Sequence, residues 1–125
     1  MKILVSVAGP KPAKDNVWYV MNLAKKLGAE VVALHISQKE DTSRGEETLK
    51  IFTDAGKDAK INVIKILKRG DIVSNIIATV EKESVKLIIM GATPGKAVTE
   101  WVSTGVMEKA QVPMLVIPYE FNKIV

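Results

Sequence analysis

The segment best suited to hold a charged ligand is the glycine-bearing run Gly91-Ala92-Thr93-Pro94-Gly95-Lys96-Ala97. It is similar to a P-loop, in which backbone amides surround phosphate while a lysine and a hydroxyl hold the terminal phosphates and magnesium. It departs from that pattern twice, because its glycines are one residue too close and Ala97 stands where the hydroxyl belongs. A glycine-bearing loop that enters a helix still attracts anions through free N–H groups. The run is therefore either an anion-binding loop or a plain strand-to-helix turn.

Few other side chains could perform chemistry. The chain has no cysteine and one histidine, His35, at the end of an apolar run. We expect His35 to be hydrogen-bonded locally, because metal sites and His-based triads need partners that are scarce here. No serine lies in a Gly-x-Ser-x-Gly elbow, and Asp71 is placed to cap a helix. The sequence therefore predicts a protein that is not an enzyme and has no metal site.

The net charge of +4 at first suggests a nucleic-acid partner. The charge is spread evenly, since each half of the chain carries a net +2, and only Arg44 and Arg69 are arginines among the 18 basic residues. Arginine is the residue that suits bidentate phosphate and guanine contacts. We therefore predict a lysine-rich solvated surface and no specific nucleic-acid binding. The apolar runs are far shorter than the roughly 20 residues of a membrane-spanning helix, so we also expect no membrane partner and a cytoplasmic location.

Strand and helix patterns alternate along the chain. Predicted strands are short, nearly continuous apolar runs, which is typical of strands buried on both faces, and they cover 3–8, 31–36, 61–67, 87–91 and 113–118. Predicted helices carry apolar residues at helical spacing; they begin near Asp15, Ser43, Asp71 and Val98. Ser43 with Glu46 forms a capping-box pattern. We predict that Trp18 and Trp101 are half-buried packing residues on their helices, and that Trp101 could wall a pocket.

Five strands separated by four helices predict an α/β fold: one five-stranded parallel sheet with helices on both faces, joined by right-handed crossovers, in a single domain of residues 1–125. Pro113 and Pro118 bracket the last strand, which favours a sheet edge or an interface. In such sheets ligands bind outside the carboxyl ends of the strands, where the strand order reverses. The loops after the first and fourth strands are therefore the predicted ligand-binding loops.

The sequence resembles the universal stress protein family over essentially the whole chain. The segments that carry the resemblance are Lys2-Ile3-Leu4-Val5-Ser6-Val7, Gly28-Ala29-Glu30-Val31-Val32-Ala33-Leu34-His35-Ile36, Gly70-Asp71-Ile72 with Ile76, Leu87-Ile88-Ile89-Met90-Gly91 and Val112-Pro113-Met114-Leu115-Val116-Ile117-Pro118. The resemblance implies an adenine-nucleotide-hydrolase-like, Rossmann-like fold, a cytoplasmic role in stress adaptation, and homodimers that pair through the last strand. It places the dimer interface at Pro113, Met114, Leu115, Val116 and Ile117.

The family divides into ATP binders and proteins without the ATP motif. Binders end the first strand with an acidic residue, where this chain has Ala8, and carry Gly-x-x-Gly, nine residues, then Gly and Ser/Thr after the fourth strand. Here Gly95 and Gly105 match the long spacing, but Gly91 to Gly95 is one residue too long and Val106 replaces the hydroxyl. Resemblance thus places the chain in the branch lacking the full motif. It also gives a candidate degenerate nucleotide site: Ala8, Gly9, Ile36, Gly91, Thr93, Gly95 and Lys96.

We therefore predict a dimeric, non-enzymatic stress-response protein that binds protein partners or a small ligand and needs no cofactor. The alternative is an ATP- or AMP-binding switch, or a slow ATPase, that uses the loop after the fourth strand. The tail, Tyr119 to Val125, is more apolar than a free tail should be. We predict that it packs on a partner subunit or covers a sheet edge.

Overall fold

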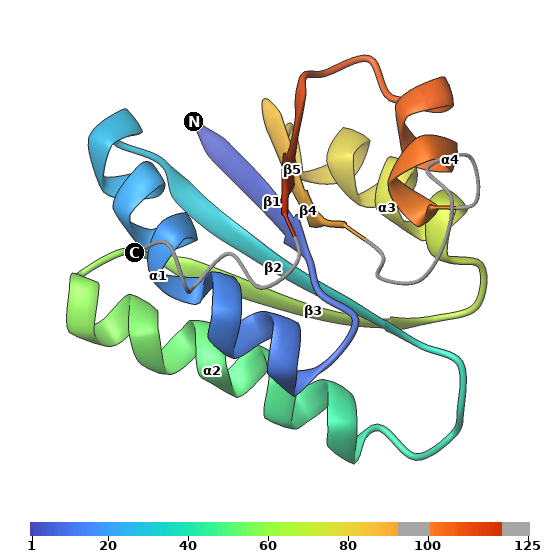
Figure 1. The fold of residues 1–125 in the computed structure, drawn as a ribbon, viewed down its shortest axis with the longest axis horizontal. Coiled ribbons are helices and arrows are strands. Elements are labelled where there is room, and N and C mark those ends of the chain that lie inside the picture. The colour runs from blue at the N-terminus through green and yellow to red at the C-terminus, as the bar shows by residue number, and fades with distance from the viewer. Residues whose placement is uncertain (93–100, 119–125) are drawn as a thin grey trace.

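The computed structural model describes residues 1–92 and 101–118. These residues form one parallel sheet between two helical layers, as the sequence predicted (Figure 1). The elements in chain order are β1 (Lys2–Ser6), α1 (Pro10–Leu27), β2 (Glu30–Ser37), α2 (Ser43–Ala59), β3 (Val63–Arg69), α3 (Ile72–Glu83), β4 (Leu87–Gly91), α4 (Val102–Lys109) and β5 (Met114–Ile117).

The sheet has the strand order β3-β2-β1-β4-β5, and every neighbouring pair is parallel. The chain moves outward from β1 to β3 and then crosses back to β4 on the other side of β1. The strand order therefore reverses between β1 and β4. In the described residues β5 pairs with β4 alone, which confirms the prediction that the last strand lies at an edge.

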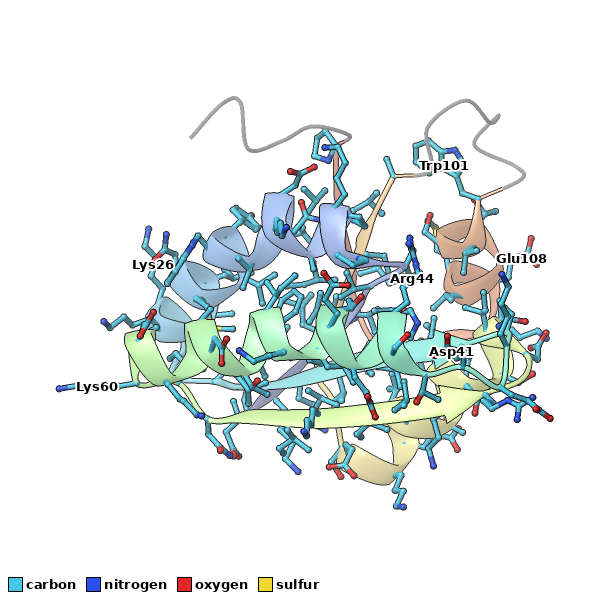
Figure 2. All side chains as sticks on the ribbon, turned by 90° about the horizontal axis from the view of Figure 1, so that it is seen from below. Lys26, Asp41, Arg44, Lys60, Trp101 and Glu108 are labelled. Carbon is cyan, nitrogen blue, oxygen red and sulfur yellow. The ribbon has the colours of Figure 1, made fainter. Side chains whose placement is uncertain are left out.

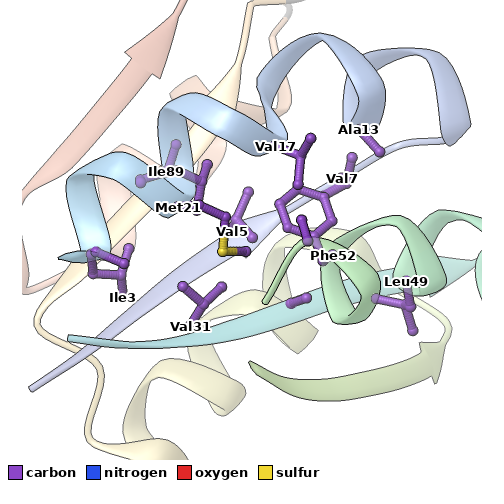
Figure 3. Close-up of a cluster of buried hydrophobic side chains, with 14 of the residues drawn as sticks. Ile3, Val5, Val7, Ala13, Val17, Met21, Val31, Leu49, Phe52 and Ile89 are labelled. Carbon is purple, nitrogen blue, oxygen red and sulfur yellow. The ribbon is translucent and has the colours of Figure 1, made fainter. Parts of the chain in front are cut away.

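Alternating residues of the central strands supply two separate cores. Ile3, Val5 and Val7 face the layer formed by α1 and α2, where Phe52 is fully buried (Figure 3). Leu4 faces the opposite layer, formed by α3 and α4. Because a strand's side chains alternate between the faces, β1 must be apolar at nearly every position to serve both cores. This explains the three consecutive apolar residues Ile3, Leu4 and Val5 at its centre.

Two helix starts within the described residues differ from the predictions; the start predicted near Val98 lies outside these residues, and α4 begins at Val102. Helix α1 begins at Pro10, not after Asp15, because proline is well suited to the first helical position and Gly9 serves as the N-cap. Thr42, not Ser43, is the N-cap of α2, and it forms no side-chain capping bond, so the predicted capping box is absent. The Asp71 prediction is confirmed, since its side chain accepts a 2.8 Å hydrogen bond from the Ser74 N–H.

Strand bounds and the burial of one tryptophan also differ from the predictions. The first strand covers Lys2–Ser6 instead of 3–8. The third strand covers Val63–Arg69 instead of 61–67, because residue 61 still belongs to the turn that closes α2: its N–H bonds to the Gly56 carbonyl. Trp18 is 51% exposed, so it is not a half-buried packing residue. It lies one position beyond the buried stripe that includes Val17 and Met21. Trp101 is half-buried as predicted, immediately before α4.

Candidate functional site

A cavity of about 270 Å³ lies at the carboxyl ends of β1 and β4, at the point of strand-order reversal. Its volume lies just below the roughly 300–1,000 Å³ typical of ligand pockets. Residues from both layers and from the sheet line it: Val5, Ser6, Val7, Ala8, Lys11, Pro12, Asp15, Asn16, Ile36, Ile72, Ile89, Met90, Gly91, Ala92, Val102, Ile117 and Pro118. Open parallel sheets bind ligands at such points.

Most of the cavity wall is apolar, and its polar side chains are few. Asn16 is only 8% exposed, and the Asp15 carboxylate is paired with the Lys11 ammonium at 3.0 Å. Ser6 lies at the end of β1. A wall of this kind suits a ligand with a flat, apolar body, because such a body loses little hydration on entry while a few polar groups fix its orientation.

The predicted site residues come together only in part. Ala8, which lies two residues after β1, and Ile36 and Gly91, at the ends of β2 and β4, all line the cavity. Gly9 is the N-cap of α1 next to Ala8 and does not line it. Thr93, Gly95 and Lys96 lie outside the described residues. A Cβ on Gly91 would meet only Asn16 Nδ2, at 3.6 Å, among the described residues, so this glycine is not required by local packing.

The start of α1, which borders the cavity, offers few backbone donors. Pro10 and Pro12 have no N–H, and the Ala13 N–H already bonds to the Gly9 carbonyl at 3.2 Å. The first turn also contains no acidic side chain. The N–H groups that usually make a helix start attractive to phosphate are thus largely missing. An anion beside the start of α1 would therefore have to be held by side chains.

Arg44, which was not predicted as a site residue, provides such a side chain close to the cavity but outside its lining. It begins in α2 and extends toward the start of α1 (Figure 2). There the guanidinium lies over Gly9, so that a Cβ on Gly9 would be 2.2 Å from a terminal nitrogen of Arg44 and 2.8 Å from Cζ. Because the chain has only two arginines, Arg44 could have been singled out from the sequence as a candidate anion-binding residue. Its place beside Gly9, however, follows only from the packing of α2 beside α1.

His35 has the local role that the sequence predicted. It is 6% exposed, and its Nδ1 lies 2.8 Å from the Val7 carbonyl oxygen. A carbonyl only accepts, so Nδ1 carries the hydrogen. The bond joins the end of β2 to the residue after β1, and thereby fixes the backbone that lines the cavity. The imidazole also packs against Gly45, where a Cβ would lie 2.6 Å from Cδ2.

Within residues 1–92 and 101–118, no group of three or more His, Cys, Asp and Glu side chains could hold a metal ion. Likewise, each helix in this part of the chain is too short or too polar to cross a membrane.

The sequence profile of the universal stress protein family matches residues 1–118. No curated protein matches this chain in sequence. The fold, by contrast, is similar to many solved structures.

Three of them illustrate the similarity. A universal stress protein in complex with cAMP has 13% identity and a TM-score of 0.81, with 94% of this chain and 96% of that one covered. A universal stress protein from Archaeoglobus fulgidus, in complex with dAMP, has 18% identity and a TM-score of 0.75, covering 93% and 96%. A universal stress protein family protein from Arabidopsis thaliana with AMP bound has 13% identity and a TM-score of 0.70, covering 94% and 91%. With the profile match over 118 residues and this shared Rossmann-like fold, the chain belongs to the universal stress protein family.

Proposed function

We propose that this chain is a non-enzymatic stress-response protein that binds a small ligand with a flat, apolar body in the cavity at the carboxyl ends of β1 and β4. The observation that carries the proposal is the position of the cavity at the strand-order reversal, with walls that are mostly apolar. Adenine nucleosides are the first ligands to test. The related structures contain AMP, dAMP or cAMP, and these three nucleotides share an adenine base joined to a sugar.

Two features of the chain favour binding without turnover. Asp15, the carboxylate on the wall, is already engaged by Lys11, and the imidazole of His35 is buried against Gly45 and the Val7 carbonyl. Neither group is therefore placed as an available general base. The departures from the phosphate motif point the same way, since each missing hydrogen bond to a charged group weakens binding by about 1.5–3 kcal/mol.

The test is calorimetric titration of the purified chain with adenosine and, separately, with magnesium-ATP, alongside a phosphate-release assay. We expect adenosine to bind, magnesium-ATP to bind no more tightly, and phosphate release to stay at background. Ser6→Phe should abolish adenosine binding, because Ser6 lines the cavity and its register partner Met90 lines it too. Circular dichroism checks that the variant is folded. Adenosine that binds this variant as well as it binds the wild type would contradict the proposed location.

The second candidate function, a nucleotide-dependent switch or slow ATPase, rests on the same cavity and on the nucleotides named in the related structures. It predicts micromolar magnesium-ATP binding and measurable phosphate release. Either result would replace the first proposal.

We also propose that the chain forms a homodimer through β5. Supporting this, β5 has one open edge among the described residues, and its first three residues are only partly buried. Main-chain groups at such an edge can pair with a second copy. The proposed interface is the one that the family resemblance gave: Pro113, Met114, Leu115, Val116 and Ile117.

A further inference from the structure

Arg44 and Gly9 fit together in a way that holds a positive charge at the rim of the cavity, meaning the turn from Ala8 to Pro12 that borders it; neither Arg44 nor Gly9 is itself a lining residue. The guanidinium occupies the space where a side chain on residue 9 would lie: a Cβ there would be 2.2 Å from a terminal nitrogen and 3.1 Å from Nε. Because Gly9 has extended backbone with φ 179°, its conformation does not require glycine. The glycine is therefore explained by the space that Arg44 takes up.

The charge of Arg44 is not neutralised within the described part of the chain. The ion pairs there join Lys2 to Glu83, Lys11 to Asp15 and Lys50 to Asp54, and none involves Arg44. No hydrogen bond of its guanidinium is found there either. Holding an arginine against a turn without an acidic partner contributes little to stability, so a ligand is a better reason for it.

The guanidinium is related to the cavity through the turn that it lies against. Gly9 directly follows Ala8 and comes two positions before Lys11, and both Ala8 and Lys11 line the cavity. A ligand whose flat body fills the apolar interior would direct a charged substituent outward, past this rim. Pro10 and Pro12 leave the start of α1 with few N–H donors for that substituent. Arg44 has the donors that the helix lacks, in a fork that suits phosphate or carboxylate.

We propose that Arg44 is a specificity-determining residue of the cavity, which selects ligands bearing a single anionic group on an apolar body, and that Gly9 exists to admit its guanidinium to the rim. This rests on the proposed function, because it needs a ligand in that cavity. It assigns anion recognition to the start of α2 and not to the glycine-bearing loop after β4.

The probe pair is adenosine and AMP, which share the base and sugar and differ by the phosphate. Each is titrated by calorimetry against the wild type and four variants. Arg44→Gln should weaken AMP binding by about tenfold or more, the loss expected for one charged hydrogen bond, and leave adenosine unchanged. Arg44→Lys should recover part of the loss, because it restores the charge but not the fork.

Gly9→Ala is the sharper variant, because the new methyl group would displace only the flexible end of Arg44. We expect it to fold with almost unchanged stability and to lose much of the AMP preference. Lys26→Gln is the matched charge control. It removes one positive charge at the far end of α1, about 22 Å along the helix from Lys11 and well beyond the ~8 Å screening length, so it should alter neither affinity.

The outcomes separate the two proposals. If adenosine binds but Arg44→Gln keeps the wild-type ratio of AMP to adenosine affinity, the role of Arg44 is overturned and ligand binding in the cavity stands. Should Lys26→Gln reduce AMP binding as much as Arg44→Gln does, the effect is one of net charge and Arg44 has no specific role. If neither probe binds the wild type, both proposals are wrong.

Discussion

Replacing Gly56 by alanine should destabilise this fold, although the same change in most helices stabilises. Gly56 lies in α2 where the turn into β3 closes over the helix. A Cβ there would be 2.4 Å from Val63 Cγ2 and 2.8 Å from the Ile61 carbonyl oxygen. Carbon atoms in good contact are about 3.5–4.0 Å apart, so the overlap with Val63 exceeds 1 Å by this measure.

The neighbours of Gly56 can yield little. Val63 is β-branched and has a stiff χ1 angle, and the Ile61 oxygen belongs to the backbone of the turn. That turn is fixed by the Ile61 N–H, which donates to the Gly56 carbonyl at 2.9 Å. Overpacking of this kind costs about 1–3 kcal/mol, and the better helix propensity of alanine returns about 1 kcal/mol. We expect a net loss of up to about 2 kcal/mol in the free energy of unfolding.

Gly105→Ala is the matched control, because Gly105 is also a helical glycine but has more room. Its Cβ would lie 3.1 Å from Val73 Cγ2, a contact relieved by a shift of a few tenths of an ångström. This variant should be neutral or more stable by up to about 1 kcal/mol. Urea unfolding followed by far-ultraviolet circular dichroism measures both variants. If Gly56→Ala proves as stable as Gly105→Ala, then Val63 and the Ile61 carbonyl do make room for the methyl group, contrary to our prediction.

Three further predictions follow from burial, edge placement and capping. Phe52→Ala should lower the free energy of unfolding by about 3–5 kcal/mol because Phe52 is fully buried, whereas Trp18→Ala, at a 51% exposed position, should change it by less than about 0.5 kcal/mol in the same urea assay. Val116→Arg should convert a dimer to monomers in light scattering, while Ile64→Arg on the opposite edge strand should not; a wild-type protein that is already monomeric would contradict pairing through β5. Hydrogen bonds from the Ser74 hydroxyl and N–H lower the pKa of Asp71 below its ordinary 3.8, so the stability advantage of the wild type over Asp71→Ala should be complete at neutral pH and fade as the pH falls through that lowered pKa; an advantage unchanged at pH 2 would refute it.

The order and type of the elements could be predicted because each strand and helix has its own local pattern. The run from Ile3 to Val5 is apolar at every position because both faces of the strand are buried, and Asp71 caps a helix through an atom of its own side chain. Element starts were less predictable where neighbours decide them. Proline and aspartate both suit helix starts, so the sequence alone did not choose between Pro10 and Asp15 for α1.

In the candidate site, too, some residues could be predicted from the sequence and others could not. Ala8, Ile36 and Gly91 could be predicted to meet, because the carboxyl ends of parallel strands converge on one edge of a sheet. Arg44 could not be predicted, since its position depends on how closely α2 lies beside α1 and on the space above Gly9. The exposure of Trp18 was likewise decided by the direction of one helix face.

Three properties of this protein follow from its amino-acid order: the alternation of buried strands and amphipathic helices, the edge position of the proline-bracketed last strand, and the scarcity of catalytic side chains. These are properties of neighbouring residues in the chain. The meeting of Arg44 with Gly9 beside the cavity depends on the folded arrangement, because the two residues are 35 positions apart in the sequence and meet through the packing of two helices. Helix packing depends on the sum of many contacts over a whole layer, and no local pattern records that sum.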